Sequence, residues 1–181
     1  MNFLNYYYRS IITYNLINKF NHKTIKNLPA LKAIILNFGC KSSDLKLLTN
    51  SLLALELITG KKGTITRAKN ANILLKIRKG NPVGCKVQLK KGLMYTFLTK
   101  LIFEIFPKVK SLNYLLYKND ANNTAAISCK ISNTLIFSEF EKNYYLFNNL
   151  TGLQITFLTN AKTQSEFLYL LNSFKIPTKV K

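Results

Sequence analysis

The chain has 181 residues, of which 27 are Lys or Arg and 7 are Asp or Glu, so its net charge is +20 and its isoelectric point is near 10.0. Hydrophobic residues make up 48% of the sequence, which is enough to build a core and excludes a disordered polar chain. The most apolar long stretch, residues 95–106, is interrupted by Lys100 and Glu104 and is shorter than the roughly 18 residues that a membrane span needs. The composition therefore predicts a folded protein without a membrane span and with a polyanionic partner.

The N-terminal segment has no acidic residue before Asp44, which is also typical of organelle transit peptides. Apolar residues at near-helical spacing between Phe3 and Phe20 favour instead a helix that is docked on a protein surface. We expect one domain over residues 1–181, with residues 1–28 as an N-terminal helical arm and residues 29–177 as an α+β core.

The middle of the chain carries strand and helix signals in turn. Residues 31–38 predict a strand that Gly39 ends, and Asp44 is placed to begin a helix that Gly60 ends. Four shorter segments follow, namely strand-like residues 64–68, strand-like residues 72–77, a turn at residues 80–84 and an alternating strand at residues 85–89.

The last part of the chain begins with apolar residues that predict a buried helix over residues 93–106, ended by Pro107. Strands are expected at residues 133–137 and 153–159, and a last helix at residues 164–174. The order of elements shows no regular alternation of strands and helices and no internal repeat. We therefore expect an α+β fold in which helices pack on one face of an antiparallel sheet.

Cysteine and histidine chemistry is sparse in this sequence. Cys40, Cys85 and Cys129 stand about 45 residues apart without a Cys-x-x-Cys pair, and His22 is the only histidine. This spacing fits neither a zinc site nor a disulfide framework, so we expect free thiols that are buried or half-buried. His22 lies in a polar stretch and is expected to be a solvated structural residue. We predict no metal, no cofactor, no catalytic residue and no enzymatic activity.

Glycines at positions 80 and 84 stand too close together for a nucleotide-binding Walker loop, and a strand is expected to follow them where that motif needs a helix. Positive charge dominates this part of the chain, because residues 61–110 contain thirteen Lys or Arg residues and the single acid Glu104. Alternation in residues 76–79 and 86–90 would direct cations to one face of a sheet. Such a face can be merely solvated, but an uncompensated cationic face favours phosphate contacts.

Several motifs in this sequence resemble one known family, the large-subunit ribosomal protein number five that binds 5S ribosomal RNA. The most specific stretch is residues 76–87, KIRKGNPVGCKV. The other motifs, in the same order as in the family, are LNFG at 36–39, GKK at 60–62, ITRAK at 65–69, PKVK at 107–110, GLQI at 152–155, AK at 161–162, LL at 170–171 and FKIP at 174–177.

The resemblance implies an α+β domain that grips 5S ribosomal RNA in the central protuberance of the large subunit. On matching positions, the residues at or near this RNA would be Asn37, Lys61, Lys62, Thr66, Arg67 and Lys69. The alternating strand cations add Lys86 and Lys90 to the expected RNA-binding residues. The loop expected to project toward the P-site tRNA carries Lys76, Arg78, Lys79, Gly80, Asn81 and Pro82. Residues 111–134 would form a bridge to protein thirteen of the small-subunit head.

Composition also bears on localisation, because Lys outnumbers Arg 24 to 3 and Trp is absent, a bias of genes poor in G and C such as those of many organelles. We therefore expect a structural constituent of an organellar ribosome, in a mitochondrion in preference to a plastid. It would bind 5S and large-subunit ribosomal RNA beside other proteins of the central protuberance. The alternative is an extra-ribosomal basic adaptor for an acidic protein or an anionic membrane surface. A nucleic-acid-processing enzyme is a more distant alternative.

Overall fold

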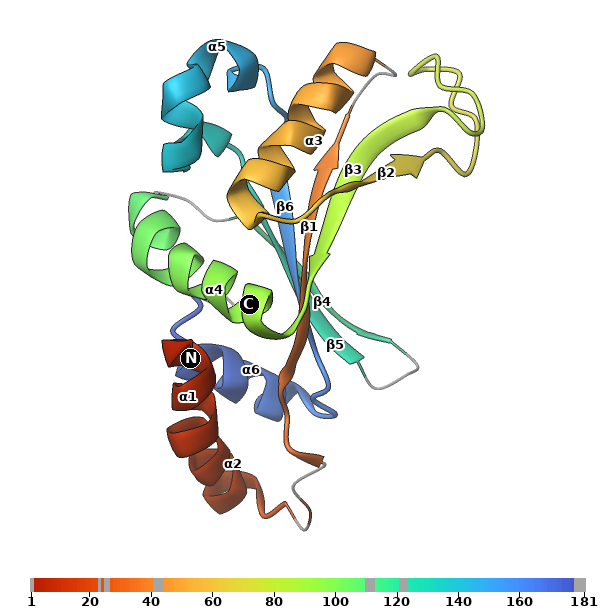
Figure 1. Cartoon of the computed structure of the whole chain (residues 1–181). Coiled ribbons are helices and arrows are strands. Elements are labelled where there is room, and N and C mark those ends of the chain that lie inside the picture. Colours follow the sequence, from red (N-terminus) through yellow and green to blue (C-terminus); the bar gives the residue numbers. More distant parts are fainter. Residues whose placement is uncertain are drawn as a thin grey trace. The chain divides into compact units, whose positions relative to one another are not determined.

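The computed structural model describes residues 2–22, 24, 27–40, 44–109, 113–120 and 124–177. Among these residues the strands form a six-stranded sheet in the order β2-β3-β1-β6-β5-β4. The strands are β1 (Leu31–Gly39), β2 (Thr64–Arg67), β3 (Pro82–Leu89), β4 (Asn113–Asp120), β5 (Thr124–Ile131) and β6 (Leu153–Thr159). The sheet is antiparallel and helices accompany it, so the predicted α+β class is confirmed (Figure 1).

The helices are α1 (Phe3–Tyr7), α2 (Thr13–Phe20), α3 (Leu45–Thr59), α4 (Lys91–Lys100), α5 (Tyr144–Phe147) and α6 (Gln164–Ser173). The π-helical turns η1 (Tyr8–Ile12) and η3 (Leu101–Ile105) continue helices, and 3₁₀ turns are formed by η4 (Phe106–Lys108), η5 (Thr134–Ile136) and η6 (Ser138–Asn143). None of the helices in the described ranges is both long and apolar enough to cross a bilayer.

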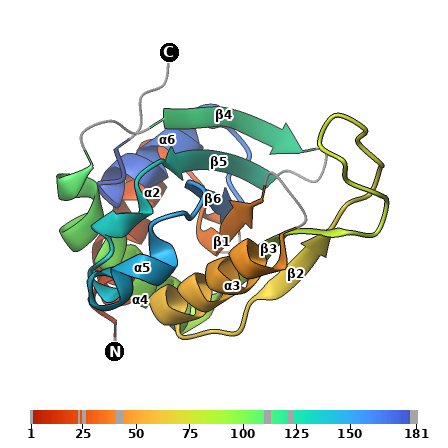
Figure 2. The same ribbon diagram turned by 90° about the horizontal axis from the view of Figure 1, so that it is seen from above.

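The chain forms two compact units. The first comprises Met1–Ile34, Leu89–Cys129 and Thr156–Lys181, and the second comprises Ile35–Gln88 and Lys130–Ile155. Within each unit the helices lie on one side of its strands (Figures 1 and 2). The expectation of one domain with residues 1–28 as an arm stays a prediction.

The N-terminal helix of the first unit runs without a break through α1, η1 and α2, as its apolar spacing predicts. Its buried side chains Leu4, Ile12 and Leu16 hold it in the unit, where α1 packs on α4 and α2 packs on α6. Asn21 ends the helix in the left-handed conformation, with φ +48°.

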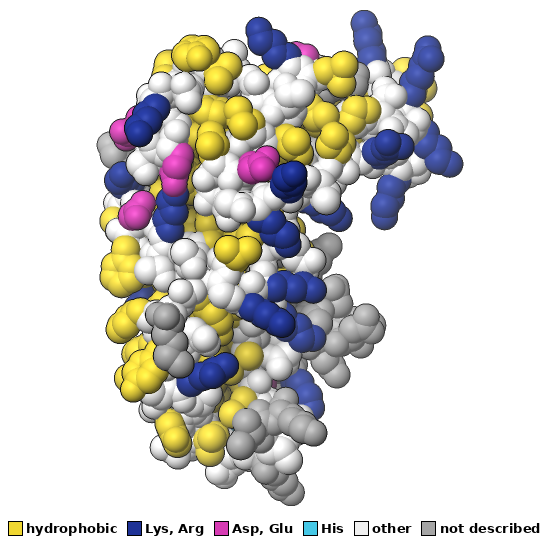
Figure 3. All heavy atoms as spheres, in the orientation of Figure 1, with side chains coloured by type: hydrophobic (Ala, Val, Ile, Leu, Met, Phe, Trp, Pro, Cys, Tyr) yellow, Lys and Arg dark blue, Asp and Glu magenta, His cyan; other side chains and the backbone are white. Residues whose placement is uncertain are grey.

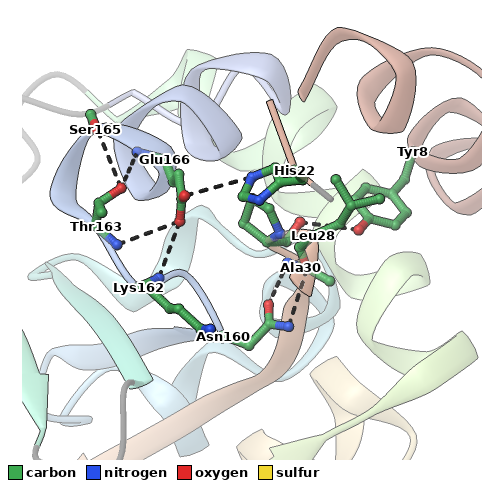
Figure 4. A network of polar contacts seen from close by, with 10 residues as sticks. Tyr8, His22, Leu28, Ala30, Asn160, Lys162, Thr163, Ser165 and Glu166 are labelled. Atoms are coloured by element: carbon green, nitrogen blue, oxygen red, sulfur yellow. Dashed lines mark hydrogen bonds and ion pairs between the residues drawn. The ribbon is translucent and has the colours of Figure 1, made fainter. Parts of the chain in front are cut away.

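A polar network in the same unit joins the segment before β1 to the segment between β6 and α6 (Figure 4). The Asn160 side chain accepts a hydrogen bond from the Ala30 amide and donates one to the Leu28 carbonyl at 3.2 Å. His22 Nε2 lies 3.6 Å from Glu166 Oε1, and both side chains are 11% exposed. The expectation that His22 is solvated is therefore wrong, because residues distant in sequence cover it.

Helix α3 of the second unit has the ends that its sequence predicts. The Asp44 carboxylate accepts a hydrogen bond from the Lys46 amide at 3.0 Å, and Gly60 ends the helix with φ +64°. The Asn50 side chain donates to the Leu146 carbonyl at 2.9 Å and so links α3 to α5. A cluster of buried rings under η6 and α5 is formed by Phe137, Phe140 and Phe147.

Two predicted strands are wrong. Residues 72–77 form turns with a single bridge between Asn72 and Ile77. Residues 133–137 contain the 3₁₀ turn η5 and its two flanking residues, since the Asn133 side chain accepts a hydrogen bond from the Leu135 amide at 3.0 Å and so competes with strand pairing. Strands β4 and β5 were not predicted from the sequence. The strands at 31–39, 64–67, 82–89 and 153–159 and the helices at 91–105 and 164–173 agree with prediction within a few residues.

Candidate nucleic-acid interface

The hairpin of β2 and β3 carries most of the predicted RNA-binding residues. Its register pairs Thr64 with Lys86 and Thr66 with Gly84, and an irregularity follows between Thr66 and Arg67. The Thr64 hydroxyl also donates to the Lys86 carbonyl at 3.1 Å. Alternation along β3 leaves Lys86 exposed between the buried residues that flank it. Alternation therefore exposes Lys86 on β3 as predicted, but it is the one cation within this strand. Residues 76–79 lie in a loop, so the predicted alternation of cations along a strand is wrong there.

The hairpin loop, residues 68–81, is closed at its base by two hydrogen bonds. The Ala68 amide donates to the Asn81 carbonyl at 2.9 Å, and the Gly80 amide donates to the Ala68 carbonyl at 3.0 Å. Gly80 has φ +89°, a conformation that costs little only for glycine, and it redirects the chain into β3.

A second, smaller loop is formed inside the hairpin loop. Asn72 and Ile77 exchange backbone hydrogen bonds of 2.8 and 3.0 Å, and Lys76 adopts φ +52° between them. Ile77 is the buried anchor of this loop, with 7% of its surface exposed. At the tip, Ile73 and Leu74 are 92% and 94% exposed. Sequence reasoning missed this apolar tip, although three consecutive apolar residues do not fit the alternation of a half-buried strand.

The hairpin surface is defined here as the basic and polar groups on β2, on β3 and on the segments directly before and after β2, namely Lys61, Lys62, Thr66, Arg67, Lys69 and Lys86. Its five cations are exposed and Thr66 is half-buried. Lys61 Nζ donates to the Gln88 carbonyl at 2.7 Å, which holds this ammonium group beside β3. Asn37 is half-buried on β1, the strand next to β3 in the sheet order.

The loop residues predicted to face tRNA continue this charge. Lys76, Arg78 and Lys79 are exposed, and none of them makes a salt bridge with an acidic side chain in the described part of the chain. Figure 3 shows Lys and Arg side chains gathered over β2, β3 and their loop, while the acidic side chains visible on that face lie over other elements. Such an uncompensated cationic surface suits a polyanion with regularly spaced phosphates.

One predicted RNA-binding residue is not part of the hairpin surface. Lys90 follows β3 and belongs to the first compact unit, where it lies beside Lys91 and Lys32. Lys90 therefore belongs to the first compact unit, whereas the residues of the hairpin surface belong to the second.

The three cysteines are free thiols, with Cys40 half-buried and the other two buried, as predicted. Burial raises the pKa of Cys85, although its hydrogen bond with Ser51, 3.1 Å long, acts in the opposite direction. Burial also raises the pKa of Cys129, to about 12. These thiols are therefore protonated and unreactive near neutral pH.

Comparison with known proteins identifies the family. A family model for the C-terminus of the ribosomal protein L5 family matches residues 82–178. The chain is 39% identical over 179 residues to the large ribosomal subunit protein uL5m of Reclinomonas americana, with 98% of each chain covered. It is 35% identical to the uL5 protein of Nitrosomonas europaea, with 96% of each chain covered. Identity to the uL5 protein of Wigglesworthia glossinidia brevipalpis is 38%, over 94% of this chain and 96% of that protein. The match along nearly the whole chain, together with the fold, shows that this protein belongs to the uL5 family of large-subunit ribosomal proteins, which are structural and not enzymatic.

Proposed function

We propose that this structural constituent of the large ribosomal subunit binds 5S ribosomal RNA through the hairpin surface, with Asn37 and Lys90 as further contacts. The observation that carries this proposal is the set of exposed cations on and beside β2 and β3 without acidic partners among the described residues. Lysine ammonium groups neutralise backbone phosphates as point charges, while the Thr66 hydroxyl and the Asn37 amide can bond to sugar or base edges. The contact would therefore position RNA more than it reads sequence.

A charge reversal tests this assignment. We expect the triple variant Lys61→Glu, Lys62→Glu and Lys69→Glu to bind a 5S ribosomal RNA transcript weaker by at least about a hundredfold at roughly 0.15 M salt, because each lost phosphate contact removes counterion release. Filter binding over a titration of the protein measures the affinity.

The matched control reverses three exposed lysines elsewhere in the same unit, Lys46→Glu, Lys130→Glu and Lys142→Glu. It makes the same change in net charge, and charges farther than about 8 Å from the RNA are largely screened at this ionic strength. Equal losses for the two triple variants, or no loss for either, would contradict the assignment of the hairpin surface.

The hairpin loop supports a second part of the proposal, a contact with the P-site tRNA. Its exposed cations Lys76, Arg78 and Lys79 stand on a stem that backbone hydrogen bonds close, and Gly80, Asn81 and Pro82 shape the return to β3. A projecting cationic loop is suited to the backbone of a second RNA. Weaker tRNA retention in the P site of ribosomes that carry neutralised loop cations is the expected result.

We also propose a bridge from residues 111–134 to protein thirteen of the small-subunit head, and contacts with neighbouring proteins of the central protuberance. Part of this segment, residues 111–112 and 121–123, lies outside the described residues. This proposal rests on the family alone.

The proposed setting is the mitochondrial ribosome. It is supported by the likeness to the uL5m protein of Reclinomonas americana and by the lysine-rich composition, while bacterial uL5 proteins are similar to a comparable degree. A tagged chain should sediment with mitochondrial large subunits and stay bound in moderate salt. Release from the subunits in moderate salt would favour an extra-ribosomal adaptor.

A further inference from the structure

The first compact unit contains a hollow lined by four cationic side chains from three separate segments. Arg9 belongs to η1 of the N-terminal helix and Lys32 belongs to β1, while Lys90 follows β3 directly and Lys91 is the first residue of α4. The hollow has a volume of about 550 Å³, and its other lining residues are Asn5, Tyr8, Leu31, Gly92, Met94 and Tyr95. No acidic residue is among these lining residues of the described chain. We call this site the basic pocket.

Hydrogen bonds inside the unit hold the three segments together. The Asn2 side chain donates to the Gly92 carbonyl at 2.7 Å and to the Thr96 hydroxyl at 3.0 Å, so the start of the N-terminal helix is fixed to α4. The Tyr8 hydroxyl donates to the Pro29 carbonyl at 3.0 Å, so the same helix is fixed to the segment before β1. The positions of the segments that carry the cations are therefore set by hydrogen bonds within the unit.

The electrostatics of the basic pocket favour an anion. All four cations are exposed, and none of them has an acidic partner among the residues that the structure describes. Buried Leu31, Met94 and Tyr95 form part of the lining, so the charges are grouped over an apolar floor. Four like charges around one hollow repel one another and destabilise the fold unless an anion enters.

Two tyrosines report on the same environment. Burial raises the pKa of Tyr8 to about 12, with a further contribution from Tyr95, so its hydroxyl remains a hydrogen-bond donor at physiological pH. Burial also raises the pKa of Tyr95, and the Arg9 guanidinium acts in the opposite direction. Arg9 is therefore close enough to influence the floor of the pocket electrostatically.

We propose that the basic pocket binds a backbone phosphate group of ribosomal RNA, as a second RNA contact that is structurally separate from the hairpin surface. The inference rests on the proposed RNA-binding function and extends it to Arg9, Lys32 and Lys91, which no motif singled out. The Arg9 guanidinium can bond two phosphate oxygens, the lysines neutralise the charge, and the Asn5 amide adds a donor. Ribosomal RNA is the polyanion that a large-subunit constituent meets, which favours it over an acidic protein.

The test neutralises two cations that lie in the pocket and outside the hairpin surface. The full chain carrying Arg9→Gln and Lys32→Gln is compared with a control carrying Lys108→Gln and Lys162→Gln, two exposed lysines of the same unit that do not line the pocket. Both variants lose two charges. The probe is deproteinised RNA from large ribosomal subunits, and affinity is measured by filter binding over a series of salt concentrations.

We expect the pocket variant to bind this RNA more weakly, by roughly tenfold per lost contact near 0.1 M salt, and the slope of log affinity against log salt to become shallower by about 1 per cation. The control should keep the slope of the unmodified chain. Equal slopes for the pocket variant and the control would overturn the proposal.

Two further measurements separate the possible sources of phosphate and the two proposals. Inorganic phosphate is titrated calorimetrically into the full chain and into the pocket variant, which shows whether the pocket prefers a free anion. If the pocket variant loses phosphate binding but keeps the RNA salt slope of the unmodified chain, the RNA assignment is overturned.

The Lys61, Lys62 and Lys69 reversal is measured on the same RNA. If it weakens binding while the pocket variant does not, only the pocket inference fails. If the pocket variant alone weakens binding, the assignment of the hairpin surface fails and the pocket inference stands.

Discussion

Gly84 on β3 shows how one residue controls the geometry of the hairpin surface. A Cβ atom at this position would stand 2.5 Å from the Phe38 carbonyl oxygen on β1 and 3.0 Å from the Thr66 hydroxyl on β2. Its neighbours on both adjacent strands leave no room, so the absence of a side chain permits their close approach. Because backbone atoms cannot move aside as a flexible side chain can, substitution must displace a strand.

We expect Gly84→Ala to lower the free energy of unfolding by about 1 to 3 kcal/mol, which is the range for overpacked sites. Urea unfolding followed by circular dichroism measures the change. Gly39→Ala is the control, because a Cβ atom there would meet nothing within 4 Å, and its effect should stay within about 0.5 kcal/mol. Similar values for the two substitutions would contradict the steric argument.

At the scale of elements, the start of α6 combines local and distant contacts. Thr163 and Glu166 form a capping box, in which the Thr163 hydroxyl accepts from the Glu166 amide at 3.3 Å and the Glu166 carboxylate accepts from the Thr163 amide at 3.4 Å. The same carboxylate lies 3.6 Å from His22 Nε2 (Figure 4). Glu166 therefore both caps its own helix and contacts the segment that follows the N-terminal helix.

We expect Thr163→Ala to destabilise the protein by about 1 kcal/mol through loss of the cap, as measured by urea unfolding.

In a double-mutant cycle, His22→Ala and Glu166→Ala should show a coupling of at least about 0.5 kcal/mol in the free energy of unfolding, because the two side chains are in contact. Thr163→Ala and Asp44→Ala remove the caps of two different helices, so their losses of stability should be additive. A coupling of His22 with Glu166 no larger than in this control pair would contradict a stabilising interaction between the two side chains.

Elements were predictable where neighbouring residues decide them. The cap at Asp44, the glycine end at Gly60 and the strict alternation of residues 85–89 all act within one turn or one strand. Residues 72–77 were mispredicted because a short continuous apolar run also fits a fully buried strand, whereas the structure exposes Ile73 and Leu74 at a loop tip. Asn133 likewise directs a local turn that short apolar runs do not reveal.

At the scale of the whole molecule, the net charge of +20 makes the folded protein repel itself, since compaction brings like charges closer together. We expect the melting temperature of the isolated chain to rise with ionic strength as salt screens this repulsion. Each kcal/mol gained corresponds to about 2 to 4 °C for a chain of this size. Thermal unfolding in sodium chloride from low to moderate concentration measures the effect, and an unchanged or falling melting temperature would contradict it.

The sequence by itself determined the family, the α+β class, the free thiols and the exposure of Lys86 on β3, because ordered motifs, composition and short-range periodicity carry this information. Tertiary structure alone decided three other features: the burial of His22 against Glu166, the projection of Ile73 and Leu74, and the meeting of Arg9, Lys32 and Lys91 around one pocket. These features join residues that are far apart along the chain or depend on how a loop is held. Their placement depends on how helices and loops pack on the sheet, and no pattern confined to a few neighbouring residues specifies that packing.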